Sequence, residues 1–154
     1  MFKKHINNPV FGGPDIGVCF DVYVTYIEGV YRMDFSWRDK KSLAVTFSND
    51  GIHWQEPQIT LRFNEVSGWE DDINRNCVLK IDNMYKMWYA AGETYEPNVL
   101  CYAESIDGIN WKKYESNPVF EKGTEEFEKN RVGGCQVIKT DDMGYLMFYI
   151  GYKN

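Results

Sequence analysis

The sequence predicts an all-β protein, a β-propeller of four-stranded antiparallel blades that is incomplete in this chain. The first observation is a phrase that occurs twice, Ser-Asn-Asp-Gly-Ile-His-Trp at 48–54 and Ser-Ile-Asp-Gly-Ile-Asn-Trp at 105–111. The second is composition, because aromatic residues make up 16% of the chain and favour strands over helices. A repeat of this length with aromatic strands and Asp-Gly turns is typical of propellers and similar arrays.

Two shorter phrases follow the same repeat. Tyr-Arg-Met at 31–33 returns as Tyr-Lys-Met at 85–87 and as Tyr-Leu-Met at 145–147. Asn-Pro-Val-Phe occurs at 8–11 and again at 117–120, which is about two repeat lengths later. Each copy is therefore long enough to hold four short strands with their turns, the content of one propeller blade.

The first blade is expected over about residues 21–62. Glu28-Gly29 supplies the turn after its inner strand, and a charged loop at 37–41 follows its second strand. Asp50-Gly51 is a tight hairpin signal that leads out of the third strand. The strands of this blade are expected at 21–27, at 31–36, at 43–48 and from Trp54 onward.

The second blade is the most complete copy and is expected over about residues 72–120. Asp82-Asn83 forms its first turn, a loop rich in Gly, Pro and Asn lies at 92–98, and Asp107-Gly108 forms the last hairpin. The strands of this blade are expected at 76–81, at 85–90, at 99–104 and from Ile109 onward. In both blades the Trp after the Asp-Gly turn is expected to pack in the core.

A partial third blade is expected over about residues 131–154, with a strand region at 135–149 that a turn at Asp141-Asp142 interrupts. Residues 1–11 resemble a stray outer strand, because they end in the same tetrapeptide that ends the second blade. Residues 1–154 are thus expected to form a single partial propeller domain of about two and a half blades. Closed propellers need at least four blades.

Composition and charge argue against several classes of partner and site. The net charge is −6 and the pI is about 4.9, so that no basic stripe is available for nucleic acid. The apolar runs are strand-sized and the N-terminus lacks a signal peptide, so we expect no membrane partner and a cytoplasmic location. The four cysteines show no Cys-x-x-Cys spacing, so we expect buried thiols and neither a metal nor a cofactor.

The repeated phrases resemble the five-bladed propellers of glycoside hydrolase family 43 and its relatives, including the levanase/invertase group and the mannoside phosphorylases. The motifs that carry this resemblance are Tyr-Lys-Met-Trp-Tyr at 85–89, Tyr-Ala-Glu-Ser-Ile-Asp-Gly-Ile-Asn-Trp at 102–111 and Asn-Pro-Val at 117–119. Phe-Asp-Val-Tyr at 20–23 and Gly-Trp-Glu-Asp-Asp-Ile-Asn-Arg at 68–75 are similar to a bacterial β-xylosidase-like subgroup. The resemblance covers nearly the whole chain and implies about half of such a domain.

The resemblance also implies an activity and some of its residues. It implies hydrolysis of a glycosidic bond with inversion, and it matches Asp21 to the general-base aspartate of the family. The family places a general-acid glutamate at the start of the third inner strand, but the matching stretch at 131–136 contains no carboxylate. The identity of the acid therefore stays open among the other carboxyl groups.

Strand order predicts where a sugar would bind. Because neighbouring strands are antiparallel, the start of each inner strand and the loop after the second strand lie on one face. Carboxylates there could perform acid/base work, while arginines and aromatic rings could hold the sugar. The candidate catalytic residues are Asp21, Asp72, Glu93 and Glu96. The candidate substrate-binding residues are Trp37, Arg38, Arg75, Arg131 and Tyr95, and the expected partner is an oligosaccharide or glycoside.

Each of these residues also has a purely structural interpretation. Asp21 could accept hydrogen bonds from nearby backbone N–H groups, and Arg75 and Arg131 could serve as ion-pair partners of adjacent acids. Two functions therefore stay open, a glycoside hydrolase and a non-catalytic carbohydrate-binding or structural remnant. The uncharged edge expected at 145–149 would need a strand partner. We accordingly expect a homodimer in which a second copy completes the propeller.

Overall fold

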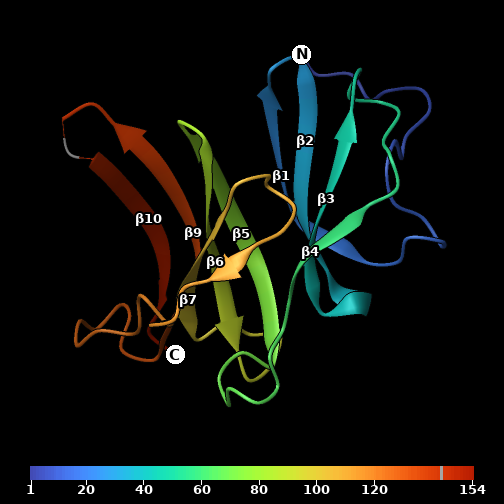
Figure 1. The fold of residues 1–154 in the computed structure, drawn as a ribbon. Coiled ribbons are helices and arrows are strands. Elements are labelled where there is room, and N and C mark those ends of the chain that lie inside the picture. Colours follow the sequence, from blue (N-terminus) through green and yellow to red (C-terminus); the bar gives the residue numbers. More distant parts are fainter. Residues whose placement is uncertain (143) are drawn as a thin grey trace.

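The chain forms three antiparallel β-sheets that lie side by side like segments of a fan (Figure 1). The computed structural model describes residues 1–142 and 144–154. The first sheet has four strands in the order β1 (Cys19–Ile27), β2 (Val30–Trp37), β3 (Ser42–Ser48) and β4 (Gln58–Arg62). A single turn of 3-10 helix, η1 (Arg38–Lys40), follows β2. The predicted all-β class is confirmed.

The middle sheet repeats this order, and the third sheet has two strands. The middle sheet contains β5 (Asp72–Ile81), β6 (Met84–Gly92), β7 (Val99–Ser105) and β8 (Lys112–Lys113). The third sheet pairs β9 (Arg131–Thr140) with β10 (Gly144–Tyr152). The predicted turn at Asp141-Asp142 lies between them, while residue 143 falls outside the described part of the chain. Among the described residues, no helix has the length and apolar character that crossing a membrane requires.

The repeated Asp-Gly phrases adopt the same hydrogen-bonded turn. The Oδ1 atoms of Asp50 and Asp107 each accept the backbone N–H groups two and three residues further along, all at 2.8 Å. Hydrogen bonds from the side chains of His53 and Asn110, and then those from the backbone, lower the pKa of both aspartates. The sequence repeat therefore corresponds to a structural repeat.

These turns also correct the predicted start of each fourth strand. We expected Trp54 to open β4, but β4 begins at Gln58, and β8 contains only Lys112 and Lys113. Because each aspartate holds the next residues in the turn, pairing with the third strand resumes only beyond the Trp. Trp54 and Trp111 instead pack against hydrophobic clusters, as expected for core residues.

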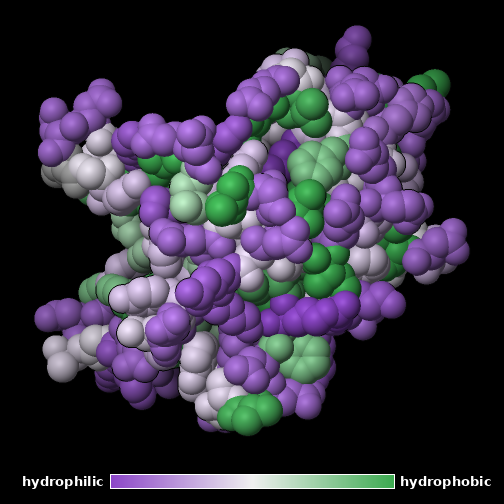
Figure 2. All heavy atoms as spheres, in the orientation of Figure 1, coloured by the Kyte–Doolittle hydropathy of each residue, from purple (hydrophilic) through white to green (hydrophobic). Residues whose placement is uncertain are grey.

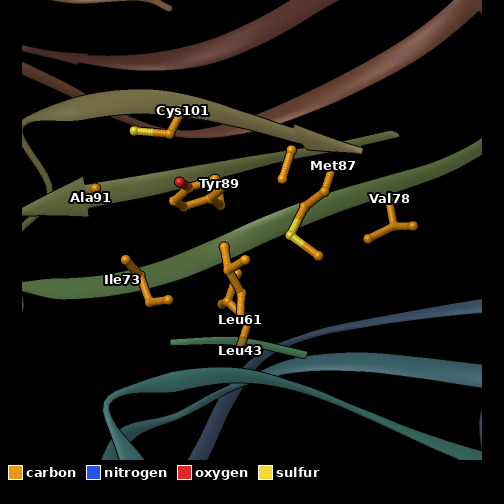
Figure 3. Close-up of a cluster of buried hydrophobic side chains, with 9 residues drawn as sticks. Leu43, Leu61, Ile73, Val78, Met87, Tyr89, Ala91 and Cys101 are labelled. Atoms are coloured by element: carbon orange, nitrogen blue, oxygen red, sulfur yellow. The ribbon is translucent and has the colours of Figure 1, made fainter. Parts of the chain in front are cut away.

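The first and middle sheets share the largest hydrophobic cluster (Figure 3). Leu43 and Leu61 of the first sheet pack against Met87 and Tyr89 of β6, and all four are buried. Each fully buried side chain of this size contributes roughly 1.5–3 kcal/mol to folding. This cluster fixes how the two sheets stack.

A buried arginine links the same two sheets. Arg32 of β2 is only 3% exposed and pairs with Asp34 at 2.7 Å. Its guanidinium also donates to the Gly108 carbonyl of the middle sheet at 2.9 Å and lies 5.3 Å from the Tyr85 ring centroid. Because the buried charge has a carboxylate, a carbonyl and an aromatic face as partners, its desolvation is offset.

The N-terminal segment differs from its expected role. Residues 1–11 form no strand. In the second copy, by contrast, Phe120 pairs with Leu100 of β7. The phenylalanine of the repeated tetrapeptide nevertheless has the same kind of neighbour in both copies. The ring centroids of Phe11 and Phe35 lie 5.3 Å apart in an edge-on contact, and those of Phe120 and Tyr149 lie 4.8 Å apart.

A buried Glu–Tyr pair recurs in two of the three sheets. Glu70 is 1% exposed and accepts hydrogen bonds from the Tyr89 hydroxyl at 2.7 Å and from Lys113 Nζ at 2.6 Å. Burial raises the pKa of Tyr89, so this hydroxyl remains a donor. Glu128 likewise accepts from the Tyr149 hydroxyl in the third sheet. Each pair ties the connection before a sheet to that sheet's second strand.

Replacing Tyr89 with Phe tests the buried pair of the middle sheet. We expect Tyr89→Phe to lower the free energy of unfolding by about 1–3 kcal/mol, because Glu70 loses a donor in a dry site. Denaturant titration followed by Trp fluorescence measures this change. Tyr149→Phe is the control and should cost less, because Glu128 is less completely buried. Equal losses in the two variants would contradict the interpretation.

Candidate functional site

The inner strands of all three sheets carry a β-bulge at the same repeat position. Asp21 in β1, Arg75 in β5 and Gly134 in β9 each lie at a shift in strand register, with φ angles of 52°, 53° and 58°. At each position the inner strand has one residue more than its partner. Bulges of this kind redirect side chains and are frequent beside active sites.

The left-handed backbone at two of these positions is costly for the residues present. Gly134 adopts it freely and Asp21 tolerates it, but Arg75 is a long side chain for which positive φ is uncommon. Conformations of this kind cost about 1–3 kcal/mol and persist where surrounding contacts hold them. At Arg75 the backbone N–H donates to Ser36 Oγ of the neighbouring sheet at 2.9 Å.

The three bulges border one pocket of about 400 Å³, here called the inner-strand pocket. Its lining includes Asp21, Arg75, Asn76, Gly134 and Cys135. A carboxylate oxygen of Asp21 lies 3.6 Å from Arg75 Nε. Burial raises the pKa of the Asp21 carboxyl from its ordinary value, and the charge of Arg75 opposes this shift. The pocket thus combines a carboxylate, a guanidinium and an amide.

Two predicted binding residues meet in the loops beside the inner strands. The Arg38 guanidinium lies 3.8 Å from the ring centroid of Tyr95 and 5.4 Å from that of Phe20. The two rings are themselves 5.2 Å apart. Asn74 Nδ2 donates to the Tyr95 carbonyl at 2.8 Å and anchors this loop to β5. The loops after β2 and β6 are therefore joined by a cation–π contact.

The remaining carboxylates have different environments. Burial raises the pKa of Asp72 at the start of β5, while the charge of Lys41 opposes this shift. Glu96 forms an ion pair with Arg131, with 2.9 Å between Oε2 and Nη1, and Arg131 also lies 4.3 Å from the Tyr152 ring centroid. Glu93 is exposed. Burial thus favours the protonated form of the Asp72 carboxyl group.

Trp37 occupies a packed position on the first sheet. Its Nε1 donates to the Ile16 carbonyl at 2.7 Å, and its ring lies 5.9 Å from the ring of Phe35. The ring is half-buried against the cluster that includes Met33. The Trp37 ring is therefore part of the hydrophobic packing of the first sheet. Lys40 Nζ lies 5.8 Å from the centroid of this ring.

Sequence reasoning missed three residues that shape this region: Phe20, Ser36 and Asn76. Phe20 was detectable in principle, because it is an aromatic residue directly before Asp21. The role of Ser36 depends on its contact with Arg75 of the neighbouring sheet, and Asn76 reaches the pocket through the bulge, so neither residue leaves a local pattern. Among residues 1–142 and 144–154, no cluster of three or more His, Cys, Asp or Glu side chains could hold a metal ion.

Comparisons with known proteins identify the fold, and this chain covers only part of the length of the similar structures. No protein-family model matches the sequence, and no curated protein matches it either. Among solved structures, a thermostable family-43 glycoside hydrolase is similar with a TM-score of 0.72 and 17% identity, over 94% of this chain and 51% of the other. At this identity the similarity establishes the fold alone.

Two further solved structures are similar in fold. One represents the GH130 family of mannoside phosphorylases, with a TM-score of 0.64 and 19% identity over 88% of this chain and 44% of the other. The other is a β-fructofuranosidase from Bombyx mori, with a TM-score of 0.64 and 17% identity over 88% of this chain and 30% of the other. The chain spans about half or less of the length of each. The predicted family-43-like propeller fold is confirmed for this part.

Proposed function

We propose that this chain binds a glycoside in the inner-strand pocket and hydrolyses its glycosidic bond, with Asp21 as the general base. One observation carries this proposal. The bulges of two neighbouring inner strands present Asp21 and Arg75 to the same pocket, 3.6 Å apart. A carboxylate with a raised pKa beside a guanidinium suits a base that works near neutral pH.

The chemistry follows the two-carboxyl scheme of inverting glycosidases. Asp21 accepts a proton from a water molecule, and the water oxygen bonds to the anomeric carbon as the bond to the leaving oxygen breaks. A second carboxyl group protonates that leaving oxygen. We assign this role to Asp72 ahead of Glu93 and Glu96, because burial raises the pKa of Asp72. Inversion requires the two carboxyl groups to lie roughly 6.5–9.5 Å apart in the working complex.

We propose that residues of the loops after β2 and β6, together with Arg75 at the bulge of β5, contact the sugar. Tyr95 offers a flat ring for an apolar sugar face, and Arg38 orders that ring from the neighbouring loop. Arg75 can donate to sugar hydroxyls from the pocket. Arg131 pairs with Glu96 outside the lining of the pocket, and Trp37 is held by its hydrogen bond to the Ile16 carbonyl.

A second function has its own supporting observation. The third bulge carries Gly134, and the stretch at 131–136 has no carboxylate where the resemblance implies the general acid. A chain with this pocket and without an efficient acid would bind carbohydrate and not hydrolyse it. Turnover measurements separate the two functions.

Asp21→Asn tests the proposed base. We expect it to lower turnover of 4-nitrophenyl glycosides at least ~100-fold, because the amide cannot accept the proton from water. Release of nitrophenolate by the purified protein measures this loss. Asp82→Asn, in the turn between β5 and β6, is the matched control and should leave turnover unchanged. Unchanged turnover in Asp21→Asn removes this residue from the mechanism.

The pH profile gives an independent test. The base must be ionised, so kcat/KM should fall as pH falls through the pKa of Asp21, above the ordinary value of 3.8. Arg75→Met removes the positive charge that lowers this pKa, so the acid limb should move to still higher pH. Lys80→Met on the same strand should leave the limb in place. An acid limb that does not move in Arg75→Met would contradict the assignment.

We further propose a cytoplasmic location and a homodimer that completes the propeller. All four cysteines are free thiols, which fits a reducing compartment. Figure 2 shows a mainly hydrophilic face with scattered apolar residues. Exposed apolar side chains also occur on β1 and β10: Val22 and Tyr26 are 54% and 63% exposed, Phe148 is 61% exposed, and Val22 and Phe148 line the inner-strand pocket. A second copy would cover these side chains and enclose the pocket.

Light scattering tests the dimer. We expect the mass of two chains at micromolar concentration, and we expect Phe148→Lys to shift the protein towards the mass of one chain, because a buried charge would oppose association. Ile106→Lys, at the exposed tip of the last hairpin of the middle sheet, is the control. A stable monomer, or deletion of residues 1–11 with no effect on assembly and thermal stability, would contradict the proposal.

A further inference from the structure

We propose that residues 3–11 form a docking segment between two copies of this chain, in which Lys4 of one copy pairs with Glu128 of the other beside the free edge of β10. This inference rests on the homodimer proposed above and names the contact that holds it together. It does not depend on hydrolysis. A sequence pattern occurs twice in the chain, and only its second occurrence meets a sheet that it fits.

The pattern is Lys-Lys-x-x-x-Asn-Pro-Val-Phe, at 3–11 and again at 112–120. In the second occurrence it connects two sheets. The side-chain amide of Asn117 pairs with both backbone groups of Tyr102 in β7, accepting from its N–H at 2.8 Å and donating to its carbonyl at 2.9 Å. The phenylalanine at the end of the pattern packs on the third sheet. The polar residues thus bind the sheet before the connection, and the aromatic residue binds the sheet after it.

The first occurrence makes only the second of these contacts. Phe11 packs on the first sheet, where its ring meets Phe35. Lys4 and Asn8 are exposed, and among the described residues no ion pair includes Lys4. Ile6 between them is 93% exposed. The segment therefore holds its own first sheet and leaves the groups that bind a preceding sheet unused.

Glu128 lacks the positive partner that its counterpart Glu70 has. Both carboxylates are buried, at 8% and 1% exposure, and both accept from the tyrosine hydroxyl of the second strand of a sheet. Glu70 also accepts from Lys113 Nζ at 2.6 Å, whereas no ion pair of the described residues includes Glu128. A buried carboxylate is costly without a positive partner. Lys4 holds the position of Lys113 in the pattern and supplies that charge.

The free edge of β10 offers the matching backbone groups. Among the described residues, β10 pairs with β9 alone, whereas β2 and β6 each lie between two strands. An edge strand presents unpaired N–H and C=O groups to another chain, and an asparagine amide can bind both, as Asn117 does. A second copy of this chain carries the segment and the edge together. Two copies related by a twofold axis make the contact twice and close the assembly.

Sedimentation velocity over a concentration series tests the ion pair through the dimer Kd. Lys4→Met should weaken the dimer at least ~10-fold, because Glu128 loses its cation. Glu128→Gln should weaken it similarly, and the double variant should be no weaker than either single variant. Lys3→Met is the matched control and should leave the Kd unchanged. The counterpart of Lys3 is Lys112, which pairs at 3.7 Å with Glu115 while both side chains are more than 80% exposed.

Hydrogen exchange tests the edge independently of the charges. In the wild-type dimer, the backbone amides of β10 that point away from β9 should be protected, because the docking segment covers them. A chain that lacks residues 1–7 should lose this protection while keeping that of the amides bonded to β9. Residues 1–7 are exposed, so their removal leaves the packed sheets intact.

The outcomes separate this inference from the homodimer itself. Equal Kd values for Lys4→Met and Lys3→Met would overturn the docking segment and leave the dimer standing. Exchange at β10 that is the same in the wild type and the shortened chain would overturn it as well. A wild type that stays monomeric at micromolar concentration would overturn both proposals. Hydrolysis is decided separately by Asp21→Asn.

Discussion

The middle sheet has no free face, and the rest of the structure depends on this. Successive residues of β6 point to opposite sides, so that Tyr89 packs towards the first sheet while Ala90 packs towards the third. A shift of one residue in strand register would exchange these two sets of side chains. Because both sets are buried against partners of fixed shape, the register of the middle sheet is set from both sides. This register also determines where the bulge of β5 lies, and therefore where Arg75 meets the inner-strand pocket.

Buried polar groups at the sheet interfaces fall into two kinds. Arg32 and Glu70 are fully paired, with partners on neighbouring elements, and they hold the sheets in one relative position. Asn76 lies in the same part of the molecule but is not paired.

Sequence reasoning located most of the strands, because Asp-Gly turns and aromatic phrases are local signals. It also brought Arg38 and Tyr95 to one face through strand order alone. The left-handed backbone at Arg75 was not predictable, since no propensity favours an arginine there and the Ser36 contact comes from another sheet. Trp37 was predicted to bind substrate because its loop follows the second strand and it had no obvious core register, and its hydrogen bond to the Ile16 carbonyl could not be read from the sequence. The sequence pattern predicted contacts within one repeat better than contacts between repeats.

The bulges have a consequence for how such a pocket evolves. Asp21, Arg75 and Gly134 share one backbone conformation although their side chains are acidic, basic and absent. The bulge therefore accommodates an acidic, a basic and an absent side chain, although at Arg75 the contact with Ser36 is needed to hold it. Duplication of an ancestral blade would have supplied equivalent positions that later diverged independently. In a protein built from repeats, substitutions at these equivalent positions can change the ligand that the pocket binds, one strand at a time.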